Sequence, residues 1–182
     1  MVVYGHDPYE NFSATVGRRL ERNPPENTLV KYFRPSTITD DHMDLSRRDK
    51  ERASRAGGKE LSTFARELYG GKLPTVVDLH DFPLYNHNNG SLLQEFDTYW
   101  IIYPGVNKKL ERILENFRNS HEQKAKIALA PVFRTGGNNE LAFEFFPVKI
   151  RADGSFDTMK VEDAEKMVRE VISYHQRNYY VI

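Results

Sequence analysis

The sequence contains no cysteine, and its charges of the two signs cancel. Without thiols the chain can form no disulfide, zinc ribbon or thiol nucleophile, so any bound metal must be held by His, Asp or Glu. Lys plus Arg equals Asp plus Glu at 26 each, so no net basic field attracts nucleic acid or anionic lipid non-specifically. We therefore expect neither nucleic acid nor a membrane as a partner.

Long apolar runs are absent as well. No stretch approaches the length of a membrane span, and the first ten residues, MVVYGHDPYE, lack the charged start and apolar core of a signal peptide. We expect a cytoplasmic protein with little chain ahead of its fold. The 182 residues, 39% of them hydrophobic, predict a single domain over 1–182 with a genuine core and a long polar loop at about residues 36–58.

The apolar pattern alternates between the periods of strands and helices. It predicts strands at 1–4, 28–33, 75–80, 98–103, 126–132 and 141–148, and helices at 11–22, 59–69, 107–119 and 161–178. A helix that leads into a β-branched strand favours a parallel crossover. The order predicts an α/β fold of three layers, α/β/α, with a mixed, mostly parallel twisted sheet.

One stretch, TVVDLHDF at Thr75–Phe82, combines a buried strand with polar chemistry. Its apolar start predicts that His80 emerges near the end of a strand, which is where open α/β sheets place their functional sites. A neighbouring carboxylate, Asp78 or Asp81, can orient that imidazole as a metal ligand is usually oriented. The alternative interpretation is a solvated Asp-His-Asp turn.

His6 follows the first predicted strand, and Glu10 comes four residues later across a turn that contains proline. If His80 arrives from the next position in the sheet, two imidazoles and one carboxylate could bind zinc and leave a fourth place open, as catalytic sites do. Asp7 is a competing oxygen ligand. Glu10 could instead be an acidic residue favoured at a helix N-terminus.

Glu144 lies within the apolar strand segment LAFEFFPV. Alternation puts it on the same face as Ala142 and Phe146, which is more typical of a cleft than of an open polar face. Burial would raise its pKa and a nearby cation would lower it, so that it could act as a general base. A half-exposed strand glutamate is the alternative interpretation.

A His and a Glu after the first predicted strand are followed by DLSRR at Asp44–Arg48, by VVDLH and by a Glu in a late strand. This order of motifs resembles the zinc carboxypeptidase and amidohydrolase superfamily, which includes the succinylglutamate desuccinylase and aspartoacylase group and the poly-γ-glutamate hydrolases. The resemblance implies a zinc-carboxypeptidase-like fold and a zinc-dependent hydrolase that cleaves an amide or peptide bond beside a carboxylate-bearing group. Its substrate would be a small molecule or peptide that carries a carboxylate.

The resemblance also implies roles for individual residues. His6, His80 and Glu10 would be the zinc ligands, Glu144 the general base, and Arg47 the side chain that holds a substrate carboxylate. Two positions differ from the family pattern, because Tyr9 stands where His-x-x-Glu has its Glu, and Ser46 replaces the Asn of DLNR. Glu10 or Asp7 therefore remains open as the carboxylate ligand, and Arg48 is an alternative to Arg47.

Two further arginines, Arg34 and Arg134, could reach the oxyanion of a tetrahedral intermediate and stabilise it. Two other functions remain as alternatives. One is a non-catalytic binding protein on the same fold that has lost its metal. The other is a phosphate-handling α/β enzyme that uses the loop containing Gly136 and Gly137, although no P-loop pattern supports it.

Overall fold

The computed structural model describes residues 1–6, 10–41, 45–82, 98–103, 107–120, 125–129 and 140–179, without the side chains of 47, 51, 125, 128 and 129. The strands in this part of the chain are β1 (Val2–Tyr4), β2 (Val30–Tyr32), β3 (Val76–Asp81), β4 (Tyr99–Tyr103), β5 (Ala125–Leu129), β6 (Glu140–Phe145), β7 (Val148–Ile150) and β8 (Phe156–Thr158). The helices are α1 (Asn11–Arg22), α2 (Arg47–Leu68), α3 (Lys108–Ser120) and α4 (Val161–Tyr179). Within these residues no helix is long and apolar enough to cross a membrane.

Six strands form one mixed sheet in the order β2-β1-β3-β6-β4-β5. Neighbouring strands are parallel except at β4 and β6, which are antiparallel. The predicted fold class is confirmed. The chain leaves β1 for β2 on one side and then returns across it to β3 on the other, so the order reverses between β1 and β3. Open α/β sheets bind ligands at such a reversal, beyond the carboxyl ends of the strands.

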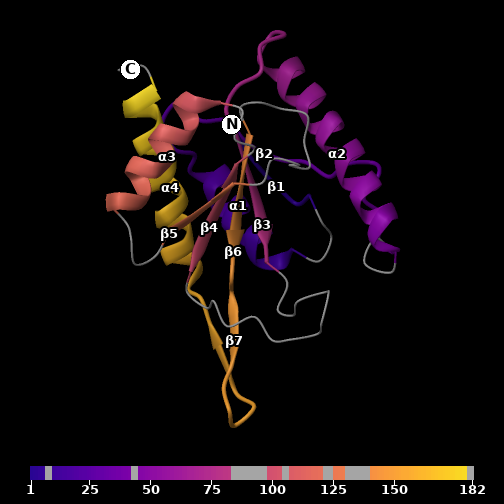
Figure 1. Ribbon diagram of the computed structural model, residues 1–182, viewed down its shortest axis with the longest axis vertical. Helices are drawn as coiled ribbons and strands as arrows, with labels where there is room; N and C mark the ends of the chain where they lie inside the picture. The colour runs from indigo at the N-terminus through magenta and orange to yellow at the C-terminus, as the bar shows by residue number, and fades with distance from the viewer. Residues whose placement is uncertain are drawn as a thin grey trace.

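The two faces of the sheet differ in chemistry. One face packs against α1, α3 and α4 in the main apolar core, which includes Leu79, Phe143 and Phe145. The other face packs against α2 only near β1 and β3, where Leu61 and Ala65 of the helix meet a smaller apolar cluster. Figure 1 shows α2 on one side of the sheet and α3 and α4 on the other. This division leaves part of the second face for polar residues.

Helix α2 is longer than the sequence predicts. Its expected start lay near residue 59, but it begins at Arg47, so much of the predicted polar loop at 36–58 is helical. Ser46 caps the helix by accepting a hydrogen bond from the backbone N–H of Asp49. The first half has no clean apolar period because it carries two buried glycines, Gly57 and Gly58, in place of large apolar side chains.

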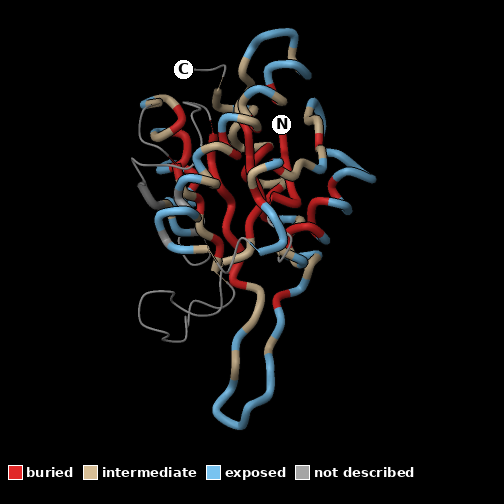
Figure 2. Tube along the Cα trace, turned by 90° about the vertical axis from the view of Figure 1, so that its right-hand side faces the viewer, coloured by how far each residue is buried: buried red, intermediate tan, exposed pale blue. Residues whose placement is uncertain are grey.

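The predicted strand at 141–148 is divided into two. β6 ends at Phe145, and after Pro147 the chain continues into β7, which pairs with β8 in an antiparallel hairpin. Figure 2 shows this hairpin extending from the buried body of the protein, largely exposed to solvent. Phe156 at its far end is 63% exposed. The hairpin leaves the sheet at the end where β3 also finishes, because β3 and β6 are parallel.

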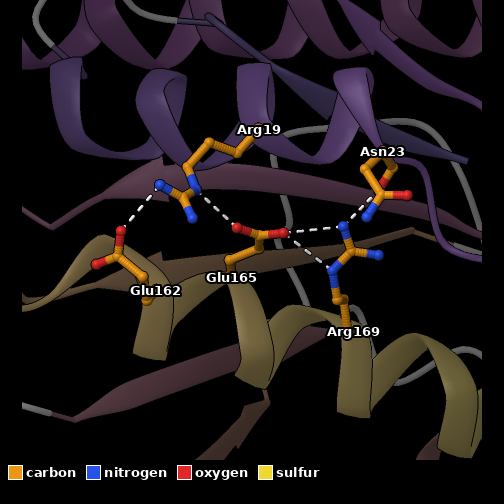
Figure 3. A network of polar contacts seen from close by, with 5 residues as sticks. All are labelled: Arg19, Asn23, Glu162, Glu165 and Arg169. Atoms are coloured by element: carbon orange, nitrogen blue, oxygen red, sulfur yellow. Dashed lines mark hydrogen bonds and ion pairs between the residues drawn. The ribbon is translucent and has the colours of Figure 1, made fainter.

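Helices α1 and α4 are joined by a network of charged side chains (Figure 3). Arg19 of α1 contacts Glu162 at 2.8 Å and Glu165 at 2.7 Å. Arg169 contacts Glu165 from the other side and donates to the backbone carbonyl of Asn23, just beyond the end of α1. Glu165 therefore bridges two guanidinium groups, which fixes the two helices against each other on the face remote from α2.

Candidate metal centre

Two histidines meet at the point where the strand order reverses. His6 follows β1 through Gly5, whose φ of +84° is in the left-handed region that glycine adopts without strain. A Cβ at Gly5 would also lie 2.3 Å from the ring of Tyr32, so only glycine fits this turn. His80 lies near the end of β3. Both imidazoles are buried, and their ring centroids are 5.2 Å apart.

Asp78 lies between these imidazoles. Its Oδ2 is 2.9 Å from Nε2 of His80 and 3.1 Å from Nδ1 of His6. The His6 contact is not aligned for a hydrogen bond, and among the described residues neither Nδ1 of His6 nor Oδ1 of Asp78 has a hydrogen-bond partner. Ligand atoms from the three residues all lie within 4.8 Å of one another. The cluster can therefore converge on a single cation.

Glu10 approaches the same cluster from the start of α1. Its Oε1 is 2.8 Å from Nδ1 of His80, so the two nitrogens of that ring face two different carboxylates. Asp81, the residue after His80, accepts hydrogen bonds from the backbone N–H groups of Phe12 and Ser13. Since Asp81 anchors the first turn of α1 to the end of β3, it holds Glu10 beside His80.

Helix α2 closes the cluster on the side of His6. A Cβ added at Gly57 would lie 2.9 Å from Cβ of Pro35 and 3.4 Å from Nε2 of His6. The helix backbone therefore passes directly over the imidazole. A glycine in a helix interior costs about 1 kcal/mol relative to alanine, and close packing of this kind is a physical reason to accept that cost.

The charges of the cluster shift its protonation equilibria. Burial alone would lower the pKa of His80, but the carboxylates of Asp78 and Glu10 outweigh burial and raise it well above the usual value. Burial would likewise raise the pKa of Asp78, yet the two imidazoles hold it well below its ordinary value. Burial raises the pKa of Glu10, and it raises the pKa of Asp81 to about 6.

Glu144 occupies the neighbouring strand on the same face of the sheet. It is buried, and it is the register partner of His80 across the parallel pair β3 and β6. Parallel partners in register project to the same side, about 5 Å apart. The sheet therefore places this carboxylate next to the cluster.

The donor set fits a divalent metal. It offers imidazole nitrogen and carboxylate oxygen without sulfur, a combination that zinc accepts. The unaligned nitrogen of His6 and the unpartnered oxygen of Asp78 are buried polar atoms that a cation would satisfy. His6 and His80 would supply the imidazoles, and Asp78 or Glu10 the carboxylate.

The described arginines that the sequence singled out do not converge on the cluster as the histidines do. Arg34 is described, and its guanidinium bonds to Asp40 at 2.6 Å and to the carbonyl of Ile38 at 3.3 Å within the segment that follows β2. Arg48 is exposed on the first turn of α2. The side chain of Arg47 lies outside the described residues.

Four other residues singled out in the sequence also fall outside the described residues: Asp7, Arg134, Gly136 and Gly137. Three of the six histidines, His42, His87 and His121, fall outside them as well. The remaining histidine, His175 of α4, lies away from the cluster, with Nε2 3.3 Å from the hydroxyl of Thr75. Thr75 precedes β3, at the opposite end of that strand from His80.

Sequence reasoning gave Asp78 only an orienting role beside one histidine. Its spacing of two residues from His80 was the available signal, because side chains two apart on a strand share a face. Nothing in the sequence pointed to Gly57, since its role depends on where α2 crosses His6. The helix anchor provided by Asp81 likewise depends on how α1 meets β3.

A separate hollow of about 320 Å³ lies on the surface of α3 and α4, lined by Phe117, Lys166, Arg169, Glu170, Ser173, Tyr174 and Arg177. These helices cover the face of the sheet opposite to His80. Arg169 is already held by Glu165, and Lys166 lies 3.9 Å from Glu170. Its lining brings together no His and carboxylate set of the kind found around Asp78.

No protein-family model matches the chain, and no curated protein matches it in sequence. Among solved structures, murine aminoacylase 3 superposes with a TM-score of 0.52 and 12% sequence identity, covering 96% of this chain and 63% of that chain. A glutamate-to-alanine mutant of the murine enzyme gives the same score and identity, with 62% of its chain covered. The present chain thus spans less than two thirds of the length of either. At this identity the comparison establishes one conclusion: the chain shares the fold of murine aminoacylase 3.

Proposed function

We propose that the protein is a zinc-dependent hydrolase that cleaves an amide bond beside a carboxylate-bearing group. The observation that carries this proposal is the buried convergence of His6, Asp78 and His80 at the point where the strand order reverses. Glu144 in register with His80 supports it. The fold shared with an enzyme named aminoacylase adds support for hydrolysis of an amide.

In this proposal His6, His80 and Glu10 hold the metal, and Asp78 orients the ring of His80. A metal-binding imidazole usually donates its other N–H to a carboxylate, and Oδ2 of Asp78 is 2.9 Å from Nε2 of His80, which leaves Nδ1 of that ring, the nitrogen beside Glu10, for the metal. Zinc bound there would supply Lewis-acid polarisation of a carbonyl and activation of water.

Glu144 takes the proton from the attacking water and returns it to the amine that leaves. Proton transfer of this kind contributes about 10² to 10⁴-fold to the rate. A guanidinium at the start of α2, from Arg47 or Arg48, binds the substrate carboxylate, since its planar fork matches a carboxylate bidentately. Arg34 or Arg134 stabilises the oxyanion. The substrate is a small molecule or a peptide.

Metal analysis of the purified protein tests the proposal. After chelation and reloading we expect about one zinc per chain, and a His80→Ala variant that retains almost none. His175→Gln is the matched control, because this histidine lies at the other end of β3 and its loss leaves zinc content unchanged.

Activity is measured as release of free amine from N-acylated amino acids, with and without chelator. A folded protein that binds no zinc, and whose unfolding midpoint is unaffected by chelator, would instead establish the non-catalytic binding protein. Tight binding of inorganic phosphate by that metal-free protein would favour the phosphate-handling alternative.

A further inference from the structure

Three aromatic rings lie beside Glu144, on the same face of the sheet as the cluster. Phe82 and Phe146 stack with their ring centroids 4.5 Å apart. Trp100 is 6.3 Å from Phe82 and 6.1 Å from Phe146. We call Phe82, Trp100 and Phe146 the aromatic wall.

Sheet register connects this wall to the proposed chemistry. Glu144 of β6 is the partner of His80 on one side and of Trp100 on the other. Phe82 follows His80 by two residues and Phe146 follows Glu144 by two, so both extend the same face toward the end of the strands. The backbone N–H of Phe82 donates to the carbonyl of Phe145 at 2.7 Å, which continues the pairing beyond β3.

The aromatic wall belongs to neither of the two apolar cores of the protein. Phe82 and Trp100 are only half-buried, whereas the core rings of Tyr99, Phe143 and Phe145 are almost completely buried. The ammonium group of Lys126 lies 5.5 Å from the Trp100 ring centroid, which favours one orientation of the indole. The wall is therefore a fixed apolar surface with area that a ligand can still cover.

We propose that the aromatic wall binds the acyl half of the substrate, and that this half carries an aromatic or other flat apolar group. This rests on the proposed function. The carboxylate-binding arginines are expected on α2, which crosses above His6 and packs near β1 and β3. Trp100 of the wall lies on β4, across Glu144 from that helix, and Phe82 and Phe146 lie just beyond the ends of β3 and β6. An amide bound with its carboxylate toward α2 directs its acyl group to the wall.

Stacking explains why the acyl group should be flat. Two aromatic rings in offset or edge contact gain binding free energy beyond that expected from the area they bury, and a methyl group lacks this additional gain. The matched probes are N-benzoylglycine and N-acetylglycine, which share the amide and the carboxylate and differ only in the acyl group. We expect a preference for the benzoyl compound in kcat/KM of about tenfold or more.

Binding can be followed separately from turnover because Trp100 is the single tryptophan of the chain. N-benzoylglycine should change its fluorescence, with an affinity above that of N-acetylglycine, in the chelated wild type and in a Glu144→Gln variant supplied with zinc. Trp100→Leu should remove most of the benzoyl preference in kcat/KM, and Trp100→Phe should retain most of it. Phe156→Leu, which removes an exposed ring on the distant β7–β8 hairpin, controls for general loss of an aromatic side chain.

The two proposals fail in different ways. Equal kcat/KM for the two probes in a zinc-loaded, active enzyme would overturn the aromatic wall and leave the hydrolase intact. Absence of hydrolysis together with a benzoyl-specific change in Trp100 fluorescence would overturn the hydrolase and support the wall as a ring-binding surface. No difference between the probes in fluorescence affinity would overturn the wall whether or not zinc binds.

Discussion

Oδ2 of Asp78 lies 2.9 Å from Nε2 of His80, while the other nitrogen of that ring faces Glu10. The arrangement predicts different consequences for the two carboxylates. Asp78→Asn should weaken zinc binding by about 10 to 100-fold, the usual effect of losing the group that orients a metal-binding imidazole. Glu10→Gln should weaken it by more, because it removes a charged ligand.

Zinc affinity measured by competition with a chromophoric chelator checks this order. The two variants are matched, since each replaces a carboxylate beside His80 with its amide and keeps its size. A larger loss for Asp78→Asn than for Glu10→Gln would assign Asp78 as the ligand and Glu10 as the orienting group.

Glu144→Gln should abolish proton transfer without removing the metal. We expect kcat to fall by about 10² to 10⁴-fold with zinc content unchanged, because an amide cannot accept the proton. Glu140→Gln on the same strand and face is the control, since Glu140 is the register partner of Val76 rather than of His80. Equal activity of Glu144→Gln and the wild type would remove Glu144 from the mechanism.

Gly57→Ala should disturb His6. The new methyl group would meet Pro35 at 2.9 Å and Nε2 of His6 at 3.4 Å. Overpacking of this kind costs about 1 to 3 kcal/mol, against a gain of about 1 kcal/mol in helix propensity. We expect a small loss of stability and a clear loss of zinc affinity.

Gly17→Ala gives the comparison for this effect. Its Cβ would collide with the ring of Tyr4, on the face of the sheet that packs against α1. It should lower the denaturation midpoint more than Gly57→Ala does, while folded protein still binds zinc with unchanged affinity. If both variants lost zinc affinity equally, the contact between Gly57 and His6 would have no specific role.

His175 should make stability depend on pH. Burial lowers the pKa of His175 to about 4, from an ordinary value of 6.5. At pH values between these two, the unfolded chain binds a proton that the folded chain does not. Stability from this group is therefore complete above about pH 6.5 and is lost as the pH falls toward about 4, by about 3 kcal/mol in all.

Urea unfolding of the wild type and His175→Gln at about pH 7 and about pH 4.5, with chelator present, isolates this contribution. The wild type should lose more stability than the variant as the pH falls. Parallel losses in the two proteins would show that the histidine titrates normally in the folded state.

The sequence predicts the parts of this fold that are set by local pattern. The β-branched run before Asp78 predicts β3, and its two-residue spacing from His80 puts both on one face. The four predicted helices all form, although α2 begins earlier than predicted. The first half of α2 has no apolar stripe to reveal it, because it faces Pro35 and His6 through glycine. The β7–β8 hairpin was missed because an exposed hairpin has no buried alternation to reveal it.

The contacts within the site depend on pairing between distant strands. Glu144 meets His80 only because β6 is parallel to β3 in one register, and a shift of one residue would turn the carboxylate into the core. Trp100 joins them because β4 runs the other way beside β6. No local sequence pattern predicts either strand pairing. The sequence therefore identifies His80, Glu144 and Trp100 as residues but not which of them are neighbours across the sheet.

Because β4 pairs with β6, the cluster around Asp78 and the side chain of Trp100 lie on different parts of the sheet. His6 follows β1, and Asp78 and His80 lie in β3, whereas Trp100 lies in β4. Glu144 is in β6 between them, and Phe82 and Phe146 follow β3 and β6. In the proposed enzyme, substitutions on β4 would change which acyl group is recognised without altering the residues proposed to bind the metal. During evolution, selectivity would then be free to diverge while the proposed metal centre is retained.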